Sequence, residues 1–457
     1  MQEQYTIIPA RNLKQLYQNL GVKDGFSAKN IEGFYVPIHE DTLKKLETRL
    51  DFSTVSNDTI FLMGQTGSGK TTCLNYLTNR SEIVTSRFDF VSIDFLDPQY
   101  GLDFTDKEFD LIEMYVDIFY NILKFFGHNL SKDYVDKLVD KLKELEDKKN
   151  VTEITEQKNT WSLAGYLLEA VHNIGFGMLG IKWSLDASTK ESIRKTYKTK
   201  IVEFLNILND LCTKVDSDLQ QRGKNLLLIL DGLEKITDVA VIDKIFNAVG
   251  INNLKNILSR KIVVTPVHLS ALEGNTLNNT NDEFLISLKI FDNPLTSSQK
   301  QFSQIVQHNK ELLKQVLVVR IAEDQQLIDQ SSIELAIEKS GGFLYDFTGI
   351  LQNAIINAQT SGSAEVHKEH VKTAIADLEF KKSGSFTFDS QAIRLLYHVL
   401  KSFTTPEGRK DNVFTQQVLR NNLIITKNDV RCYFVHPLIQ KTVEVYGKSL
   451  TEASESE

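Results

Sequence analysis

The stretch Thr59–Thr72 constrains the fold more than any other part of this chain. Its first residues are apolar and β-prone, its middle is a glycine-rich loop, and a helix-forming segment follows directly. Gly64, Gly69, Lys70 and Thr71 fit the pattern G-x-x-x-x-G-K-[ST], between the strand and the helix that this pattern requires. The chain is therefore predicted to place a P-loop at the carboxyl end of a buried strand.

The P-loop pattern predicts how each residue type serves a phosphate chain. Glycines let the backbone turn so that successive N–H groups face phosphate oxygens, and the following helix adds the positive end of its dipole. Lys70 is expected to reach the β- and γ-phosphates, and the Thr71 hydroxyl to join the Mg²⁺ shell. The alternative is a plain glycine turn that binds nothing. The predicted nucleotide-binding residues are Gly64, Gln65, Thr66, Gly67, Ser68, Gly69, Lys70, Thr71 and Thr72.

A second chemical landmark is the run Asn225–Asp231. Its near-continuous apolar residues predict a strand buried on both faces, with an aspartate at the edge where open α/β sheets bind nucleotides. We interpret it as a Walker B strand whose Asp231 holds Mg²⁺. Hydrolysis also needs a carboxylate that aligns the attacking water. Glu234 is the nearest candidate, displaced because Gly232 directly follows the aspartate.

Other runs complete the predicted sheet. The strand-like runs are Phe88–Phe95, Lys261–Thr265 and Phe284–Phe291. The long interval from Lys70 to Asp231 favours the additional-strand class of P-loop ATPases over a compact GTPase, and the GTPase signals are missing, so ATP is the expected nucleotide. In that class the strand ending at Thr265 lies between the P-loop and Walker B strands. Thr265 is our sensor candidate for the γ-phosphate, and a threonine that merely ends a core strand is the alternative.

Length and composition limit the remaining architecture. At 457 residues the chain predicts two or three domains, and 41% hydrophobic with 25% charged residues is typical of a soluble globular protein. A net charge of −8 argues against coating nucleic acid by bulk charge but leaves room for a local basic patch. Cys73, Cys212 and Cys432 show no metal-ligand spacing. The sequence has no apolar signal segment and no membrane-length apolar run, so a cytoplasmic protein without membrane contact is expected.

Four features together point to a family. They are the P-loop, the Walker B sequence Asp231-Gly232-Leu233-Glu234, the strand end Thr265-Pro266 and the segment Ser340-Gly341-Gly342 before a helix. This combination resembles the AAA+/STAND group of ATPases, and it is similar in particular to the origin-recognition, transposition-regulator and NLR-like members. The resemblance implies an α/β P-loop core with a parallel sheet and a helical insertion, followed by a helical lid and a winged helix.

The expected organisation follows from that resemblance and from the sequence pattern. The divisions are an N-terminal lead-in at 1–58, the ATPase core at 59–294 with an insertion at about 105–222, the lid at 295–382, the winged helix at 383–448 and a disordered acidic tail at 449–457. The lead-in is expected beside the nucleotide base, or else as a plain packing helix with Leu43, Leu46 and Leu50 on one face. The insertion is expected to be partner-specific, because the ATPase core does not require it.

The sequence also departs from the family pattern. Tyr345-Asp346 stands where the lid helix commonly carries an arginine, called sensor 2, that contacts the γ-phosphate. The stretch from His268 to Glu283 contains no Arg or Lys that could act as an arginine finger, and Arg260 is a candidate from the preceding helix end. These departures predict a slow ATPase in which ATP and ADP act mainly as a conformational switch.

Three classes of function remain open at this point. The first is a regulatory ATPase that assembles with itself, with a protein partner or on nucleic acid, as in defence, transposition or replication-like systems. The second is a DNA-binding ATPase whose winged helix reads duplex through Phe414–Asn422, with Arg420, Lys427 and Arg431 as phosphate contacts. The third, a small-molecule kinase, is disfavoured by the large insertion. His436 is expected to be structural, because no partner residues for a metal accompany it.

Overall fold

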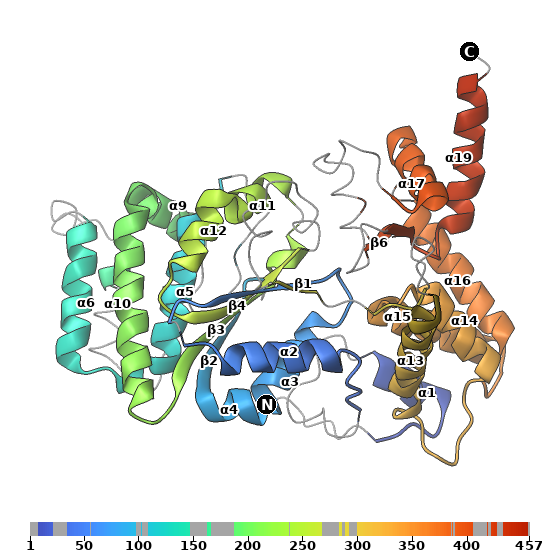
Figure 1. The fold of residues 1–457 in the computed structure, drawn as a ribbon, viewed down its shortest axis with the longest axis horizontal. Helices are drawn as coiled ribbons and strands as arrows, with labels where there is room; N and C mark the ends of the chain where they lie inside the picture. Colours follow the sequence, from blue (N-terminus) through green and yellow to red (C-terminus); the bar gives the residue numbers. More distant parts are fainter. Residues whose placement is uncertain are drawn as a thin grey trace.

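The computed structural model of the chain describes most of its length. The described residues are 8–21, 34–54, 56–96, 102, 108–146, 162–165, 187–236, 238–266, 283–285, 288–291, 299–384, 386, 389–404, 418, 422–426 and 433–455. A twisted sheet lies at the centre, with one group of helices at its far end and another beyond its opposite end (Figure 1). The first group belongs to the predicted insertion, and the second to the carboxyl-terminal part of the chain.

The sheet places the strand that ends at Thr265 where the sequence analysis expected it, between the P-loop strand and the Walker B strand. Within the described residues its strands are β1 (Thr59–Met63), β2 (Phe88–Asp94), β3 (Asn225–Asp231), β4 (Arg260–Thr265) and β5 (Glu283–Leu285). They pair in parallel in the order β2-β3-β4-β1-β5, so β4 lies between the P-loop strand and the Walker B strand. This order confirms the α/β fold class of an additional-strand P-loop protein. β5 is shorter than the predicted run, because residues 288–290 lie outside any strand.

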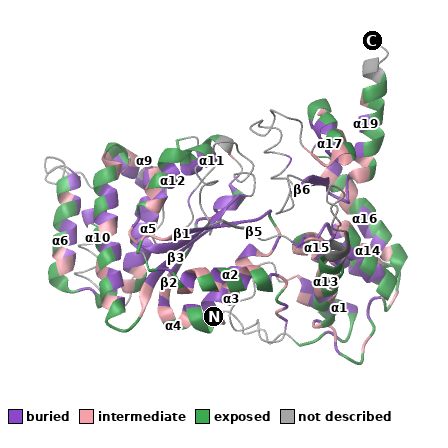
Figure 2. Ribbon diagram, viewed as in Figure 1, coloured by how far each residue is buried: buried purple, intermediate pink, exposed green. Residues whose placement is uncertain are grey.

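Alternating side chains of β3 explain why its sequence is almost continuously apolar. Leu226, Leu228 and Leu230 belong to one hydrophobic core, and Leu227 and Ile229 belong to another on the opposite face of the sheet. Figure 2 shows the strands buried between helices on both sides. One face is covered by α2 (Glu40–Asp51), α3 (Lys70–Asn79) and α4 (Glu82–Arg87). The other is covered by α5 (Leu111–Phe126), α10 (Ile201–Gln220), α11 (Val239–Phe246) and α12 (Ala248–Lys255).

The insertion is part of the sheet core rather than an addition to it. α5 begins at a capping box formed by Asp110 and Glu113, and its Tyr115 and Phe119 are fully buried against the sheet core. The expectation that the ATPase core does not require the insertion is therefore wrong for α5 and α10. α6 (Lys132–Leu145) and α9 (Ala187–Tyr197) extend this layer outward (Figure 1).

The residue pattern from about Lys190 to Gln221 predicts one long helix, but a 3-10 turn at Lys198–Lys200 separates α9 from α10. The pattern of Leu179–Ala187 predicts a short strand before it; residues 179–186 lie outside the described residues, and Ala187 begins α9.

The carboxyl-terminal half is helical, as predicted, up to a short antiparallel hairpin. The helices of the predicted lid are α13 (Gln299–Val318), α14 (Gln330–Ser340), α15 (Leu344–Thr360) and α16 (Lys368–Ser383). They are followed by α17 (Ser390–Ser402), β6 (Ile424–Thr426), β7 (Tyr433–Val435) and α19 (Gln440–Glu455). β6 and β7 pair antiparallel, with Ile425 opposite Phe434.

Both ends of the chain differ from expectation. In the lead-in, α1 (Leu13–Leu20) shares a hydrophobic core with the lid helices, and Ala10 forms a parallel bridge with Ile321, whereas α2 packs on the sheet. At the other end, the disordered tail expected at 449–457 is wrong for residues 449–455, which continue α19. The Lys448–Glu452 pair, one helical turn apart, supports this extension.

Among the described residues, no helix has both the length and the apolar character needed to cross a bilayer.

Candidate nucleotide-binding site

The predicted P-loop has the backbone shape that phosphate binding requires. β1 ends at Met63 and α3 begins at Lys70, so the loop leads directly from a buried strand to a helix N-terminus. Gly67 (φ +82°) and Gly69 (φ +104°) adopt left-handed conformations that other residues rarely take. The first N–H groups of a helix lack intrahelical acceptors, so this turn presents donors to an anion.

Lys70 folds back over its own loop. Its side chain is buried, and Nζ donates to the carbonyl oxygens of Gly64 at 2.8 Å and Gln65 at 3.1 Å. The same Nζ lies 3.9 Å from Oε1 of Glu234. Burial lowers the pKa of Lys70, and the nearby Glu234 and Asp231 carboxylates oppose that shift. The lysine is thus held at the loop by weak acceptors that a phosphate oxygen could replace.

The two predicted carboxylates converge on the P-loop helix. The Thr71 hydroxyl donates to Oδ2 of Asp231 at 3.3 Å, and Oδ1 of Asp231 accepts the N–H of Gly232 at 2.8 Å. Gly232 has φ +90° and opens the 3-10 turn Leu233–Lys235, which carries Glu234 back toward Lys70. Burial raises the pKa of both Asp231 and Glu234. The displaced carboxylate therefore reaches the site despite the inserted glycine.

The side chains present fit a magnesium ion. The Thr71 hydroxyl and the Asp231 carboxylate are hard oxygen donors placed side by side at a helix N-terminus, and Mg²⁺ prefers such ligands together with substrate phosphates. Asp94, which sequence reasoning missed, is paired in register with Asp231 at the same edge of the sheet. Its Oδ1 lies so close that a Cβ on Gly232 would stand 2.6 Å away, which explains why glycine follows Asp231.

Thr265 and Arg260 lie at opposite ends of β4. Thr265 is fully buried beside Met63, and within the described residues its Oγ1 has no hydrogen-bond partner. Arg260 is buried at the amino end of β4, where its guanidinium lies 3.6 Å from Asp216. Nucleotides bind at the carboxyl ends of parallel strands. A finger can also act on a neighbouring subunit, but the Arg260 side chain is buried in its own core beside Asp216, which argues against that role. The position of Thr265 is compatible with a sensor.

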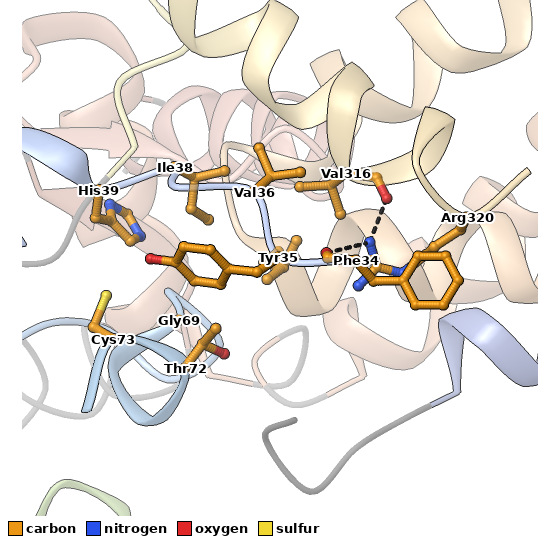
Figure 3. A pocket seen from close by; sticks show the side chains of 11 residues that line it. Phe34, Tyr35, Val36, Ile38, His39, Gly69, Thr72, Cys73, Val316 and Arg320 are labelled. Carbon is orange, nitrogen blue, oxygen red and sulfur yellow. Dashed lines mark hydrogen bonds between the residues drawn. The ribbon is translucent and has the colours of Figure 1, made fainter. Parts of the chain in front are cut away.

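A cavity adjoins the P-loop helix on the side of the lead-in (Figure 3). Residues 34–39 form one wall of this small hollow, opposite Gly69, Thr72 and Cys73. Val316 and Arg320 from the end of α13 lie at its far side. Tyr35 also stacks on Tyr76 of α3, with ring centroids 4.8 Å apart. Within the lead-in, α2 packs on the sheet, as the packing alternative expected, and residues 34–39 lie beside the P-loop helix, so a place beside the base stays a prediction for them.

The lid helix contacts the loop through its backbone rather than through a cation. The N–H of Tyr345 donates to the Gly67 carbonyl at 3.3 Å, and the Tyr345 side chain is largely exposed. Asp346 turns away from the loop, toward Lys382 at 3.2 Å and Nε2 of His436 at 2.9 Å. Neither residue of the Tyr345-Asp346 pair places a positive charge at the phosphate end of the site.

The carboxyl-terminal hairpin also reaches the P-loop, which sequence reasoning did not anticipate. The Asn422 side chain donates to the Thr66 carbonyl at 2.8 Å, and Nε2 of Gln65 donates to the Ile424 carbonyl at 2.6 Å. Asn422 has φ +51°, a conformation in which asparagine is favoured over most residues. An asparagine before a short strand run is too common a signal for such a long-range contact to be read from it.

The other C-terminal predictions have different outcomes. His436 is buried and stacks on Phe343, and its Nδ1 accepts the N–H of Leu438, in agreement with the structural role expected for it. Of the predicted duplex-reading stretch Phe414–Asn422, only residues 418 and 422 are described. Arg420, Lys427 and Arg431 lie outside the described residues, so duplex binding stays a prediction. Its test is salt-dependent binding that is lost when these three residues are changed together.

Comparisons with known proteins add only a resemblance of fold. No known protein family matches by its sequence profile, and no curated protein matches. Among solved structures, the Walker-type ATPase PABY2304 of Pyrococcus abyssi is 13% identical, covers 93% of this chain and 99% of its own, and has a TM-score of 0.43. The ORC2 protein of Aeropyrum pernix, solved in ADPNP–ADP complexes, is 12% identical over 96% of this chain and 98% of its own, with a TM-score of 0.44. Drosophila ORC bound to DNA is 13% identical over 98% of this chain and 95% of its own, with a TM-score of 0.40. At these values the similarity carries no functional argument.

Proposed function

We propose that this chain is an ATP-binding protein that hydrolyses ATP slowly and acts as a nucleotide-dependent conformational or assembly switch. Its partner would be a further copy of itself, another protein or a nucleic acid, in a defence, transposition or replication-like system. The observation that carries the proposal is the convergence of Lys70, Thr71, Asp231 and Glu234 behind a loop of P-loop shape. A lysine, a hydroxyl and two carboxylates in this arrangement suit a triphosphate and its metal ion.

Each side chain has a role in the proposed reaction. Lys70 would leave the Gly64 and Gln65 carbonyls for the phosphate chain, where a full negative charge replaces two neutral acceptors. Thr71 and Asp231 would hold Mg²⁺, which neutralises developing charge on the phosphates when it is bound. Glu234 would orient the attacking water, since its Oε2 is buried without a hydrogen-bond partner among the described residues. Thr265 would sense the terminal phosphate from the neighbouring strand end.

The hollow beside the P-loop is small as the structure stands, but it marks the place next to the loop where a base would lie. Residues 34–39 and the start of α3 enclose it next to the loop, where the nucleoside attached to a loop-bound phosphate chain would extend. Apolar and aromatic lining with a few polar groups is typical of such pockets. The adenine base is proposed to bind there, between the lead-in and the lid.

Slow turnover is proposed because, among the described residues of the lid, neither Tyr345 nor Asp346 brings a positive charge to the P-loop. An arginine supplied at the γ-phosphate contributes about 10³–10⁵ in rate to related reactions. Tyr345 occupies the sequence position where that residue is common, and its backbone N–H donates to the Gly67 carbonyl. We expect the isolated protein to hydrolyse fewer than about 10 ATP molecules per second, a rate below the median turnover number of enzymes.

The deciding experiment is light scattering of the purified protein in ADP, in ATP and in a non-hydrolysable ATP analogue. Lys70→Ala serves as the matched variant, and equilibrium binding of a fluorescent ADP analogue is measured alongside. A larger mass only with triphosphate, absent in Lys70→Ala, would support an assembly switch. Nucleotide binding with one unchanged mass would overturn self-assembly and leave a monomeric switch for another partner. Failure of the wild-type protein to bind ADP or ATP would overturn the proposed function itself.

A further inference from the structure

The carbonyl side of the P-loop is held by three segments that are far apart in the sequence. His39 of the lead-in lies with Nε2 2.8 Å from the Ser68 carbonyl. The backbone N–H of Tyr345 at the start of α15 donates to the Gly67 carbonyl at 3.3 Å. The Asn422 side chain, just before β6, donates to the Thr66 carbonyl at 2.8 Å. Three consecutive carbonyls of the loop are thus fixed by groups outside the loop.

The orientation of these carbonyls decides what the loop offers an anion. A phosphate is bound by N–H groups that point inward, and a peptide unit that presents N–H on one side presents C=O on the other. If one such peptide flipped, an oxygen dipole would replace a donor and repel the phosphate. A donor placed outside the loop therefore favours the phosphate-binding orientation without touching the nucleotide.

The contact with Asn422 is reciprocal. Its amide donates to Thr66, while its Oδ1 accepts from Nε2 of Gln65 at 3.3 Å, and the same Nε2 donates to the Ile424 carbonyl at 2.6 Å. Gln65 is buried in this contact. Asn422 and the start of the hairpin are thus hydrogen-bonded to two successive P-loop residues, Gln65 and Thr66. Hydrogen bonds depend on geometry more strongly than apolar packing does. The bond from Asn422 is lost if the Thr66 carbonyl rotates away from the hairpin.

His39 is suited to donate rather than to accept. Its partner is a carbonyl oxygen, so Nε2 must carry the proton. The side chain is buried, and burial lowers the pKa of His39 to about 4, which keeps the ring neutral near neutral pH. Gly69 lies against the same ring, since a Cβ built there would stand 3.4 Å from Nε2.

We propose that Asn422 and His39 are positioning residues for phosphate binding. Asn422, beside the hairpin, and His39, in the lead-in, hold the P-loop carbonyls pointing toward themselves and away from the phosphate side of the loop. This inference rests on the proposed function, because it assigns the regulation of the same site. By thermodynamic linkage, docking of the hairpin on the loop and binding of a phosphate chain strengthen each other by the same factor. Nucleotide is thereby coupled to the carboxyl-terminal hairpin through one layer of peptide groups.

The test compares Asn422→Asp with wild type in the full chain. Aspartate keeps the size of the side chain and tolerates a positive φ, but it removes the donor to Thr66 and adds a charge that repels its carbonyl. Asn422→Gly is the second variant, since glycine keeps the backbone conformation without any side chain. Gln352→Glu is the matched control, because Gln352 Nε2 donates to the Tyr17 carbonyl at 3.3 Å between α15 and α1, away from the loop.

Three dissociation constants are measured for each protein: those of MgATP and ADP by calorimetry, and that of adenosine by saturation-transfer NMR. We expect Asn422→Asp and Asn422→Gly to weaken MgATP and ADP about tenfold, as loss of one well-placed hydrogen bond implies, with adenosine unchanged within about twofold. Gln352→Glu should bind all three as wild type does. His39→Phe should weaken MgATP and ADP as well, and His39→Gln, which keeps a donor, should restore part of that affinity. Because His39 also lines the cavity beside the loop, the adenosine comparison rests on the Asn422 variants alone.

Other outcomes overturn the inference in distinguishable ways. Unchanged ADP and MgATP binding in both Asn422 variants would mean that the hairpin contact does not position the loop. Tighter binding would mean that the hairpin closes the site against nucleotide. An equal loss for adenosine would indicate general loosening instead of carbonyl positioning. If wild type binds no adenine nucleotide at all, the proposed function fails together with the inference.

Discussion

The ammonium of Lys70 lies 3.9 Å from Oε1 of Glu234, and both side chains are buried. This pair brings a carboxylate to the phosphate end of the site although Gly232 separates it from the Walker B aspartate. The positive φ of Gly232 and the 3-10 turn that follows reverse the chain. The spacing Asp-Gly-Leu-Glu is therefore compatible with a water-orienting glutamate, provided that glycine follows the aspartate.

Glu234→Gln is expected to separate binding from hydrolysis. Glutamine keeps the shape and can still face Lys70, but it cannot accept a proton from water, so hydrolysis should fall by about 10²–10⁴-fold. The dissociation constant of MgATP should change by less than about threefold, because Lys70 and the loop N–H groups are untouched. Single-turnover hydrolysis and calorimetry measure the two quantities.

Asp94→Asn is the matched control for that experiment. Asp94 is a carboxylate at the same edge of the sheet, one strand farther from the P-loop, and an asparagine oxygen can still accept the N–H of Leu96. We expect hydrolysis in Asp94→Asn to stay close to wild type. Equal losses in the two variants would show that net charge at this edge, and not a specific base, limits the reaction.

Thr265→Val is expected to raise stability and lower activity. Thr265 is fully buried and its Oγ1 has no hydrogen-bond partner among the described residues, so the hydroxyl is desolvated without compensation. Valine has nearly the same shape and should increase the free energy of unfolding by about 1 kcal/mol. If the hydroxyl serves the γ-phosphate, the hydrolysis rate should fall about tenfold in the same variant.

The contrast between the two readouts decides the role of Thr265. Higher stability with an unchanged rate would identify a threonine that merely ends a core strand, the alternative recognised from the sequence. Val264→Ala is a suitable comparison, since it perturbs the same strand on the opposite face and should lower stability. Thermal unfolding and steady-state hydrolysis suffice for all three proteins.

The sheet strands and the P-loop could be predicted from local sequence patterns. A glycine loop between a strand and a helix, and an apolar run ending in Asp231, are recognisable within a dozen residues because their physics is local. The spacing of these motifs favoured the additional-strand class, which implies that the strand ending at Thr265 lies between the P-loop and Walker B strands, and the structure confirms that placement. Glu234 could be named from the sequence, but its reach to Lys70 depends on the turn at Gly232, which no pattern specifies.

Contacts between distant segments could not be read in the same way. His39, Tyr345 and Asn422 approach the P-loop through single hydrogen bonds, and a single donor leaves no periodic signature in the sequence. The same limit applies to α1, whose packing against the lid helices left no signal in the sequence pattern. Sequence position alone also did not show that the Arg260 side chain is buried in the core, where it faces Asp216.

Acidification is expected to destabilise the protein partly through His39. Burial lowers its folded pKa from 6.5 to about 4. The unfolded chain takes up a proton below about pH 6.5 and the folded chain does not, so stability is full above that pH and is lost as the pH falls toward 4. Between pH 7 and pH 5 this residue should account for a loss of about 2 kcal/mol.

The variant His39→Gln isolates that contribution. Glutamine can donate to the Ser68 carbonyl but does not titrate, so the difference in unfolding free energy between wild type and variant should shrink on going from pH 7 to pH 5. Urea unfolding followed by circular dichroism at the two pH values gives the comparison. A difference that is independent of pH would show that the imidazole is protonated in the folded protein and hence accessible to water.

Asp346→Ala should loosen the junction between the lid and the carboxyl-terminal unit. The Asp346 carboxylate, although largely buried, is approached by Lys382 at 3.2 Å and by His436 at 2.9 Å, and these partners outweigh burial and keep the pKa of Asp346 below its usual 3.8. Removing it leaves Lys382 without this counter-charge, and breaking a buried pair from one side costs about 3–5 kcal/mol. We expect the carboxyl-terminal hairpin to lose protection in hydrogen exchange at residues 422–426 while the sheet strands retain theirs. Lys382→Met, which removes a charge but leaves the Asp346–His436 contact, should have a smaller effect on the same peptides. Equal loss of protection in the sheet and the hairpin would show that the two parts unfold as one unit.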